Sequence, residues 1–314
     1  MNVRPGSAPE AAVMPALNVW VISDGKPGHI NQSLGLAEAL ARAIPTHIHR
    51  LTALPAWRAC LMLLFKVLPD QTLPAPDLIV GAGHATHLTL LAARRARGGR
   101  IVVLMKPSLP RRWFDLCILP QHDGVDADAH TLVTEGALNR IRPSGARNPK
   151  RGLILIGGVS SHFEWDNDAI QVQIKSILTR TSDTHWTLTT SRRTPTDFLA
   201  QLPPAANLDI VPHTATSPDW LPEQFAQSGT VWVTPDSASM VYEALSAGAD
   251  VGVFDLPVNP KSRVGWAIAR LADANRITRF VSWCAHEKLN PNTQPLAEAD
   301  RCAAWILEWL KKNN

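Results

Sequence analysis

Short apolar runs alternate with stretches of helical periodicity along almost the whole chain. Ten apolar runs have the length and composition of buried β-strands, at residues 19–22, 47–51, 78–80, 101–104, 116–119, 153–156, 187–190, 209–211, 231–233 and 251–254. Helix-period stretches lie between them, at residues 32–43, 56–67, 85–96, 168–179, 239–247 and 264–272. This alternation predicts an α/β fold in which parallel sheets are covered by helices on both faces.

The chain length of 314 residues suits two domains of about 150 residues each. A stretch rich in proline, glycine and basic residues, residues 139–152, separates the two halves and has the composition of a linker. We therefore expect two Rossmann-like domains that face each other across a cleft. The expected boundaries are an extended or disordered N-terminus (1–17), an N-terminal domain (18–145), a C-terminal domain (146–295) and a last helix (296–314).

The overall composition is typical of a soluble globular protein. Hydrophobic residues make up 45% and charged residues 18% of the chain. The first 17 residues lack the apolar core of a signal peptide, and no run approaches the ~20 apolar residues that cross a bilayer. The four cysteines lie far apart without metal-ligand spacing, which indicates buried, reduced thiols.

Basic residues are concentrated in one part of the chain. From Arg42 to Arg112 there are 11 Lys/Arg against two Asp, a local excess of nine, whereas the net charge of the whole chain is +4. Such an excess attracts anionic lipid, nucleic acid or phosphorylated ligands, although a solvated basic face is the simpler alternative. The apolar run at 57–69 is interrupted by Arg58 and Lys66, so we interpret it as a core helix or as a helix that contacts a membrane.

The segment 153–163 carries a glycine turn at a strand end, which is where parallel α/β sheets bind ligands. Gly157 and Gly158 allow the backbone to approach a ligand closely, and Ser160 and Ser161 supply hydroxyl groups for phosphate oxygens. The alternative is a turn that needs glycine only for its backbone angles. We expect phosphate contacts here.

The segment 231–254 is the most informative, because a buried strand leads into a helix that starts with small polar residues. Ser237 and Ser239, with the helix N-terminus, could hold a diphosphate, and Glu243 could accept hydrogen bonds from a ribose diol. Asp236 belongs to the same helix start. The alternative interpretation makes Asp236 and Ser237 helix caps and Glu243 a surface charge.

Two further segments bear on charged ligands. Arg192 and its neighbour Arg193 follow the strand at 187–190 and suit an anionic ligand, with solvated surface arginines as the alternative. The acidic motifs at 126–128 and 166–168 fit a polar loop and a helix cap better than a metal site. We therefore expect no bound metal.

Two glycine turns in the first half match no standard nucleotide motif. The segment 21–29, VISDGKPGH, is not a GxxxxGK[ST] phosphate loop. The segment 80–88, VGAGHATHL, has two glycines of the dinucleotide fingerprint but lacks the third glycine and the later acidic residue. A standard NAD site is therefore not expected.

Four segments together resemble the mitochondrial-fission ELM family: WVISDGKPGHINQSLGLAEAL (20–40), IGGVSSHFEW (156–165), TTSRRTP (189–195) and VTPDSASMVYEALSAG (233–248). The resemblance runs from about residue 18 to 285. That family is in turn similar to GT-B glycosyltransferases of the MurG type, which transfer N-acetylglucosamine from UDP-GlcNAc to a lipid-linked acceptor. The resemblance implies a donor nucleotide on the C-terminal domain, no cofactor, no obligatory metal, and a last helix that packs back on the N-terminal domain.

The resemblance also implies roles for individual residues. It places donor diphosphate contacts at Gly157–Ser161 and Asp236–Ser239, and ribose binding at Glu243. Gly81, Gly83 and His84 match an acceptor-side glycine turn, and His29 matches the histidine of the first glycine loop. In that first loop, this chain has Asp24, Lys26 and Pro27 in place of a glycine-rich run.

The leading hypothesis is a metal-independent glycosyltransferase that uses a nucleoside-diphosphate sugar, with a UDP-sugar expected first, and a cell-envelope or lipid-linked acceptor. His29 is the expected base and Asp24 the second candidate, while Lys26 and Arg192 help to stabilise the diphosphate. One alternative is a non-catalytic scaffold at a membrane surface, because plant members of the family are implicated in recruiting a dynamin-related protein. Another is a nucleotide-sugar epimerase. We expect a cytoplasmic protein, peripheral on an anionic membrane, with no nucleic-acid partner.

Overall fold

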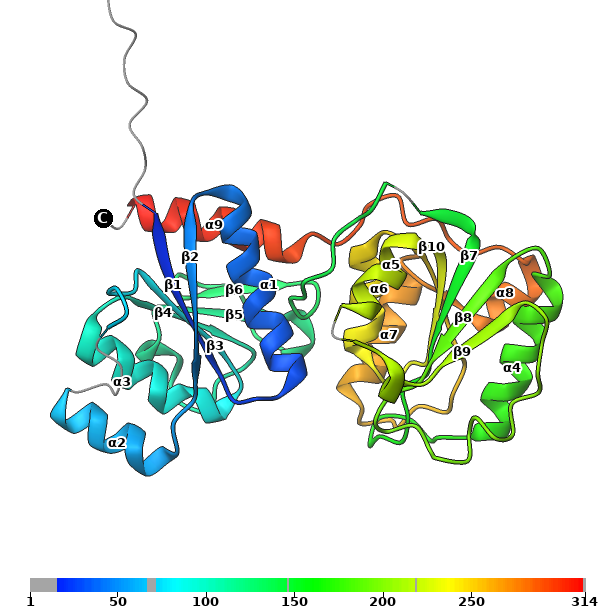
Figure 1. The fold of residues 1–314 in the computed structure, drawn as a ribbon, viewed down its shortest axis with the longest axis horizontal. Helices are drawn as coiled ribbons and strands as arrows, with labels where there is room; N and C mark the ends of the chain where they lie inside the picture. Colours follow the sequence, from blue (N-terminus) through cyan, green and yellow to red (C-terminus); the bar gives the residue numbers. More distant parts are fainter. Residues whose placement is uncertain (1–15, 67–71, 146, 218, 313–314) are drawn as a thin grey trace, which may run out of the picture.

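The computed structural model describes residues 16–66, 72–145, 147–217 and 219–312. The expected extended or disordered N-terminus lies outside the described residues except for its last two, of which Leu17 begins the first strand. Two α/β domains lie side by side (Figure 1), each built on its own parallel sheet. The predicted fold class, two Rossmann-like domains across a cleft, is confirmed.

The N-terminal domain has a six-stranded sheet in the order β2-β1-β3-β4-β5-β6, with every neighbouring pair parallel. Its strands are β1 (Leu17–Ser23), β2 (Thr46–Thr52), β3 (Leu78–Ala82), β4 (Arg100–Leu104), β5 (Leu116–Pro120) and β6 (Thr131–Thr134). Its helices are α1 (Pro27–Ala43), α2 (Ala56–Phe65) and α3 (His87–Arg97). Because all strands are parallel, the segments that follow β1, β2, β3 and β5 gather at one edge of the sheet.

The C-terminal domain repeats this design with the order β12-β11-β10-β7-β8-β9, again with parallel neighbours. Its strands are β7 (Asn148–Leu155), β8 (His185–Thr189), β9 (Leu208–Val211), β10 (Ser228–Val233), β11 (Asp250–Val253) and β12 (Thr278–Arg279). Its helices are α4 (Asn167–Arg180), α5 (Trp220–Gln227), α6 (Ala238–Ala247), α7 (Arg263–Asp273) and α8 (Phe280–His286).

The last helix, α9 (Glu298–Lys312), belongs to the core of the N-terminal domain (Figure 1, red). It packs against α1, and its Cys302, Ala303 and Ile306 are buried in the same apolar cluster as β1 and β3. Arg42 Nη2 on α1 lies 2.6 Å from Asp300 Oδ1 on α9. The chain therefore crosses between the domains twice, once before β7 and once before α9.

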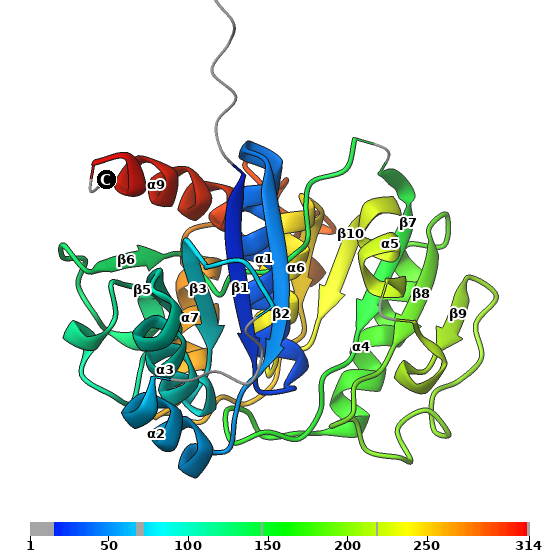
Figure 2. The ribbon, with the colours of Figure 1, turned by 60° about the vertical axis from the view of Figure 1, so that its left-hand side comes forward.

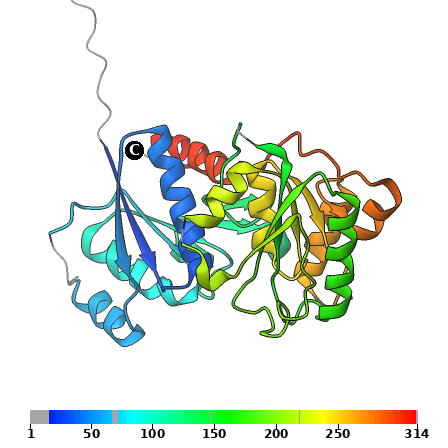
Figure 3. The same ribbon diagram turned by 45° about the vertical axis from the view of Figure 1, so that its right-hand side comes forward.

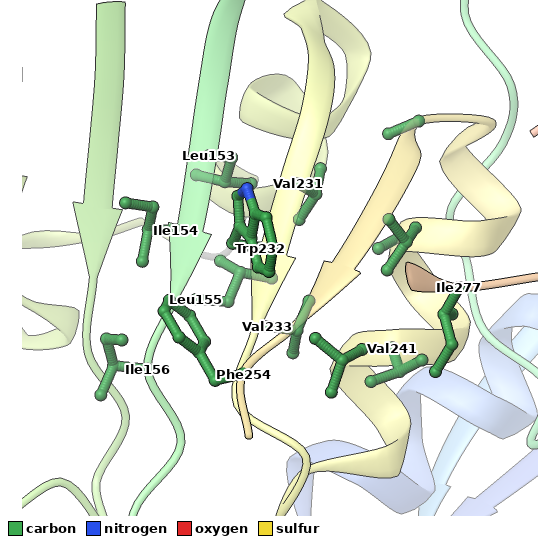
Figure 4. Close-up of a cluster of buried hydrophobic side chains, with 14 of the residues drawn as sticks. Leu153, Ile154, Leu155, Ile156, Val231, Trp232, Val233, Val241, Phe254 and Ile277 are labelled. Atoms are coloured by element: carbon green, nitrogen blue, oxygen red, sulfur yellow. The ribbon is translucent and has the colours of Figure 1, made fainter. Parts of the chain in front are cut away.

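The core of the C-terminal domain fixes the strand ends that carry the candidate site. Apolar side chains of β7 and β10 pack with Val241, Phe254 and Ile277 (Figure 4). Trp232 on β10 pairs in register with Gly252 on β11, and a side chain at Gly252 would overlap the Trp232 ring. The large ring therefore fits only because its neighbour is glycine, and it anchors β10 just before the segment 234–239.

All ten predicted strands are confirmed, and so are the predicted helices, with shifts at their ends. The additional elements are β6, β12, α5 and α8, which are short, and α5 contains Pro222. Helix α1 begins at Pro27 rather than residue 32, since proline is favoured in the first helical turn. The predicted linker at 139–152 overlaps β7, whose first four residues are exposed and therefore give no apolar signal.

Candidate functional site

The start of α1 brings Asp24 and His29 into direct contact. His29 Nδ1 lies 2.9 Å from Asp24 Oδ2, and the backbone N–H of Lys26 donates to Asp24 Oδ1 at 3.2 Å. Burial opposes ionisation of Asp24, but the His29 hydrogen bond, the Lys26 N–H and the electrostatic effect of the nearby His29 and Lys26 side chains outweigh it and lower its pKa. An ionised Asp24 accepts from Nδ1–H, so the opposite nitrogen of His29, Nε2, is the one that can take a proton.

Gly83 holds the His29 ring from the neighbouring strand. Gly83 follows β3 with a φ of +83°, which an L side chain rarely adopts, and a Cβ added there would overlap the His29 ring. Gly81 is buried, whereas His84 is exposed at the start of a short 3₁₀ helix (His84–Thr86). The two glycine turns of the N-terminal domain are therefore one packed unit, with Gly83 as the contact point.

The glycine turn after β7 is occupied by contacts within the protein. The N–H of Gly157 donates to Thr234 Oγ1 at 2.7 Å, and the N–H of Gly158 donates to Asp236 Oδ2 at 3.0 Å. A Cβ at Gly157 would overlap the Asp236 carboxylate, and one at Gly158 would overlap the backbone of Arg193. Both glycines are buried. Because they have no side chains, the Asp236 carboxylate and the backbone of Arg193 can pack directly against the turn.

Asp236 is a buried carboxylate that positions Arg193. Its side chain is 1% exposed and lies 2.8 Å from Arg193 Nη2. Burial raises the pKa of Asp236, although hydrogen bonds from Arg193 and from the Gly158 N–H oppose the rise. Arg193 also donates through Nη1 to the carbonyl oxygen of Val159 at 3.4 Å. The guanidinium of Arg193 is thus held in one place at the domain interface, with 42% of the side chain exposed.

Helix α6 presents Ser237, Ser239 and Glu243 to the space between the domains. Ser237 is the N-cap, and its hydroxyl makes no capping hydrogen bond. Ser239 and Glu243 are four residues apart, so they share one face of the helix. Burial raises the pKa of the half-buried Glu243 carboxyl from 4.5 to about 7. The buried strand β10 and Gly248, with φ +79° at the C-terminus, set the two ends of this helix.

Three cavities among the described residues are lined by both domains, and two of them share wall residues on α6. In Figures 2 and 3 helix α1 (blue) of the N-terminal domain faces α6 (yellow) of the C-terminal domain. The larger cavity has a volume of about 850 Å³. Pro27 and Gly28 line it from the N-terminal domain. Its other walls come from the C-terminal domain: Leu155, Thr189, Thr190, Ser191, Arg192, Arg193, His213, Thr216, Trp220, Leu221, Ser237, Ser239, Met240 and Glu243.

The smaller cavity has a volume of about 520 Å³. Its N-terminal-domain wall consists of Gln32, Met105, Pro120, His122, Asp123 and Ala137. Its C-terminal-domain wall consists of Val159, Ser160, Ser161, His162, Arg193, Asp236, Ser237, Ala238, Ser239, Tyr242 and Val264. Arg193, Ser237 and Ser239 line both cavities and therefore mark the border between them.

Tyr242, next to Glu243 in sequence, connects the C-terminal domain to the N-terminal domain. Its buried ring stacks on His122 with centroids 6.5 Å apart, and Gly136 leaves the space that the ring occupies. Nearby, Asn139 donates to Ser246 at 3.0 Å. These contacts join α6 to the segments that follow β5 and β6.

The structure gathers most of the predicted site residues at the two cavities. Ser160, Ser161, Arg192, Asp236, Ser237, Ser239 and Glu243 line one or both of them. Asp24 and His29 lie at the start of α1, beside the Pro27 and Gly28 that line the larger cavity. Gly81, Gly83 and His84 lie behind His29 rather than on a cavity wall, and Lys26 is exposed, 3.9 Å from Asp24.

Several cavity residues were missed by sequence reasoning. Arg193 was named only as the neighbour of Arg192. Arg193 lines both cavities, whereas Arg192 lines only the larger one. His122 and Asp123 follow β5, and Trp220 begins the missed helix α5. Because His122 and Asp123 directly follow a strand of the parallel sheet, the rule that ligands bind at the carboxyl ends of such strands could have identified them. No group of His, Cys, Asp or Glu among the described residues is arranged to hold a metal ion.

Two parallel sheets with helices on both faces, facing each other across these cavities, define the GT-B class of fold. A proposed UDP-N-acetylglucosamine 2-epimerase from Listeria monocytogenes has a TM-score of 0.64 at 11% identity, over 95% of this chain and 97% of that one. MurG from Acinetobacter baumannii has a TM-score of 0.51 at 13% identity, over 94% and 99% of the two chains. UDP-GlcNAc 2-epimerase from Neisseria meningitidis has a TM-score of 0.52 at 13% identity, over 94% and 100%.

Residues 27–310 match the sequence profile of the mitochondrial fission ELM1 family, and the chain belongs to that family. An uncharacterized protein of Rickettsia prowazekii (strain Madrid E) is 31% identical over 121 residues, which are 34% of this chain. The match spans about a third (32%) of that relative's own length.

Proposed function

We propose that the protein is a glycosyltransferase that uses a nucleoside-diphosphate sugar, with a UDP-sugar as the first donor to test. The observation that carries this proposal is that Arg193, Ser237 and Ser239 line both cavities. A nucleoside would occupy the larger cavity, the sugar would occupy the smaller one, and the diphosphate would cross the border between them. Ligand sites typically have volumes of ~300–1,000 Å³, and both cavities fall in that range.

The border offers the groups that a diphosphate needs. The N-terminus of α6 has free N–H groups and a partial positive charge. Ser237 and Ser239 add hydroxyl donors, and Arg193 adds a guanidinium that Asp236 holds in place. Gly157 and Gly158 contribute by allowing Asp236 and Arg193 to pack this closely. Arg192 and Ser160 extend the polar wall on either side.

The walls of the larger cavity support the proposal for the nucleoside half of the donor. Glu243, four residues beyond Ser239 on the same helix, would accept hydrogen bonds from the ribose diol. Trp220 and Leu221, which line the same cavity, offer an apolar wall for the base. Because the pKa of Glu243 is about 7, its carboxyl can donate as well as accept near neutral pH.

The acceptor would approach from the N-terminal domain. His29 Nε2 would take the proton of the acceptor hydroxyl as its oxygen attacks the anomeric carbon, and the C–O bond to the diphosphate would break. Asp24 would orient the His29 ring through Nδ1 and stabilise its protonated form. Such a base contributes roughly 10²–10⁴-fold to a rate. The negative charge on the departing diphosphate would be stabilised at Arg193 and the start of α6.

Calorimetric titration with UDP, UDP-GlcNAc and UDP-glucose tests the donor site. We expect binding that Arg193→Gln weakens at least tenfold, because a charge-assisted contact contributes about 1.5–3 kcal/mol. Arg151→Gln is the matched control, since Arg151 is an exposed arginine on the early part of β7, outside both cavities. Absence of binding by any nucleotide sugar, at ligand concentrations in the millimolar range, would refute the proposal and favour the non-catalytic scaffold.

Epimerisation of a nucleotide sugar is the second candidate. It is favoured by the similarity to the Listeria protein, which has the highest TM-score of the three structures described, although that similarity concerns the fold. The smaller cavity supplies His122 and Asp123 as additional acid–base groups opposite Ser160. Incubation with UDP-GlcNAc alone, followed by separation of the sugars, distinguishes the two. An epimerase forms the 2-epimer without an acceptor, and a transferase does not.

A further inference from the structure

Helix α2 (Ala56–Phe65) carries apolar side chains on two opposite faces. Its inner face is used for packing: Ala59 is fully buried, and Met62 and Leu63 pack against the apolar cluster on the outer side of the N-terminal sheet. The helix lies against α3 at the outer corner of the domain, away from the C-terminal domain (Figures 1 and 2). Packing therefore accounts for one side of α2 only.

The outer face of α2 is apolar as well. Trp57 is 62%, Leu61 47%, Leu64 68% and Phe65 67% exposed. At ~100° per residue these four positions fall within a single arc of about 100°, so they form one stripe along the helix. A surface helix normally carries polar residues there, and a helix that is apolar all round is typical of a buried or membrane-contacting element.

Cations flank this stripe at both ends. The Arg58 guanidinium lies 5.1 Å from the centre of the Trp57 ring, and Lys66 is exposed at the C-terminal end of the helix. In the sequence, one acidic residue, Asp70, lies between Glu38 and Asp77. Aromatic and aliphatic side chains edged by Arg and Lys are the composition of helices that lie in the interface of an anionic bilayer.

We propose that the outer face of α2 docks the protein on an anionic lipid bilayer. Trp57, Leu61, Leu64 and Phe65 enter the interfacial layer, while Arg58 and Lys66 contact the lipid headgroups. A second copy of the chain is less suited to cover this face, because a two-fold symmetric dimer would place Arg58 and Lys66 of both copies close together. No described helix is long and apolar enough to cross a membrane, so this contact is interfacial. The proposal is independent of the proposed enzymatic activity.

Flotation with phosphatidylcholine vesicles, with and without phosphatidylglycerol, tests this surface on the full chain. We expect binding to the anionic vesicles only. The double variant Leu64→Ser/Phe65→Ser should lose roughly tenfold or more in partitioning, since each apolar side chain contributes ~1.5–3 kcal/mol when fully buried. Val172→Ser, on α4, is the matched control because Val172 is also 68% exposed. Trp57→Ser and Trp266→Ser, 62% and 52% exposed, form a second matched pair.

The charge contribution is tested separately. Arg58→Gln and Lys66→Gln should each weaken binding roughly fivefold at low salt, and less at high salt, since a basic residue near an anionic surface contributes ~1 kcal/mol. All these side chains are exposed, so thermal unfolding should be unchanged. Equal binding to neutral vesicles, equal loss in the Val172 and Trp266 controls, or a dimer that the α2 variants abolish in sedimentation would overturn the proposal. None of these outcomes depends on nucleotide binding.

Discussion

Replacing Glu243 with glutamine removes the carboxyl group whose pKa is raised to about 7 while keeping the size of the side chain. Burial is the cause of the raised pKa, so the ionised carboxylate is disfavoured in the folded protein. The contribution of Glu243 to stability is therefore fully present below the unfolded-state pKa of about 4.5. This contribution is lost as the pH rises through about 7, because the folded protein then has to hold the charged carboxylate.

A carboxyl group with a pKa of 4.5 in the unfolded chain and about 7 in the folded protein costs ~3 kcal/mol once it is fully ionised. Glu243 is half-buried at the wall of a cavity, and solvent screening reduces this cost to about 1–2 kcal/mol. We expect Glu243→Gln to be more stable than the wild type by this amount at about pH 8, and to lose the advantage at about pH 4.

Urea unfolding, followed by tryptophan fluorescence between about pH 4 and pH 8, measures this difference. All other titrating groups are shared, so they cancel when the two free energies of unfolding are subtracted. Glu164→Gln, which makes the same chemical change at an exposed position, is the control. Parallel pH profiles for wild type and Glu243→Gln would refute the argument, and a difference that grows as the pH falls would reverse it.

Asp24→Asn should lower turnover roughly 10²–10⁴-fold, because the carboxylate that holds His29 Nδ1 is lost. Product formation at saturating donor measures this loss. Gly83→Ala should cost ~1–3 kcal/mol in urea unfolding, since its φ is +83° and the new methyl group meets the His29 ring. Gly136→Ala should loosen the domain junction, because its methyl group overlaps the ring of Tyr242, and small-angle scattering should show a larger radius of gyration.

Each of these three has a clear contrary result. Unchanged turnover in Asp24→Asn would remove the dyad from the mechanism. A fully stable Gly83→Ala would mean that the loop relaxes without strain. An unaltered scattering profile for Gly136→Ala would show that the junction accommodates a methyl group by local shifts.

The fold was predictable because the central strands, such as β3, β4 and β5, are buried on both faces and form continuous apolar runs. Elements with weak apolar patterns were missed. The first four residues of β7 are exposed and lie in a stretch of linker composition, and α5 contains Pro222. The start of α1 was placed five residues late, because Pro27 and Gly28 were interpreted as a turn although proline is common in the first helical turn.

The sequence predicted site residues at individual strand ends, but it did not predict the contacts between residues that are distant in the sequence. The rule that ligands bind at the carboxyl ends of parallel strands located Ser237, Ser239 and Glu243. The distinction between Arg192 and Arg193 depends on the buried Asp236, which is 43 positions away from Arg193 and 44 from Arg192. Such a contact leaves no local pattern in the sequence. The same holds for the contribution of His122 and Asp123 from the opposite domain.

Tyr242 is the one tyrosine of the 314-residue chain, and it lies where the two domains touch. A protein labelled with fluorotyrosine would therefore give a single ¹⁹F resonance, without any mutation and without assignment. The adjacent His122 ring would shift that resonance through its ring current while the domains are closed. Exchange between closed and open arrangements would thus be visible as line broadening at one natural reporter, in the free protein and during a titration with any candidate ligand.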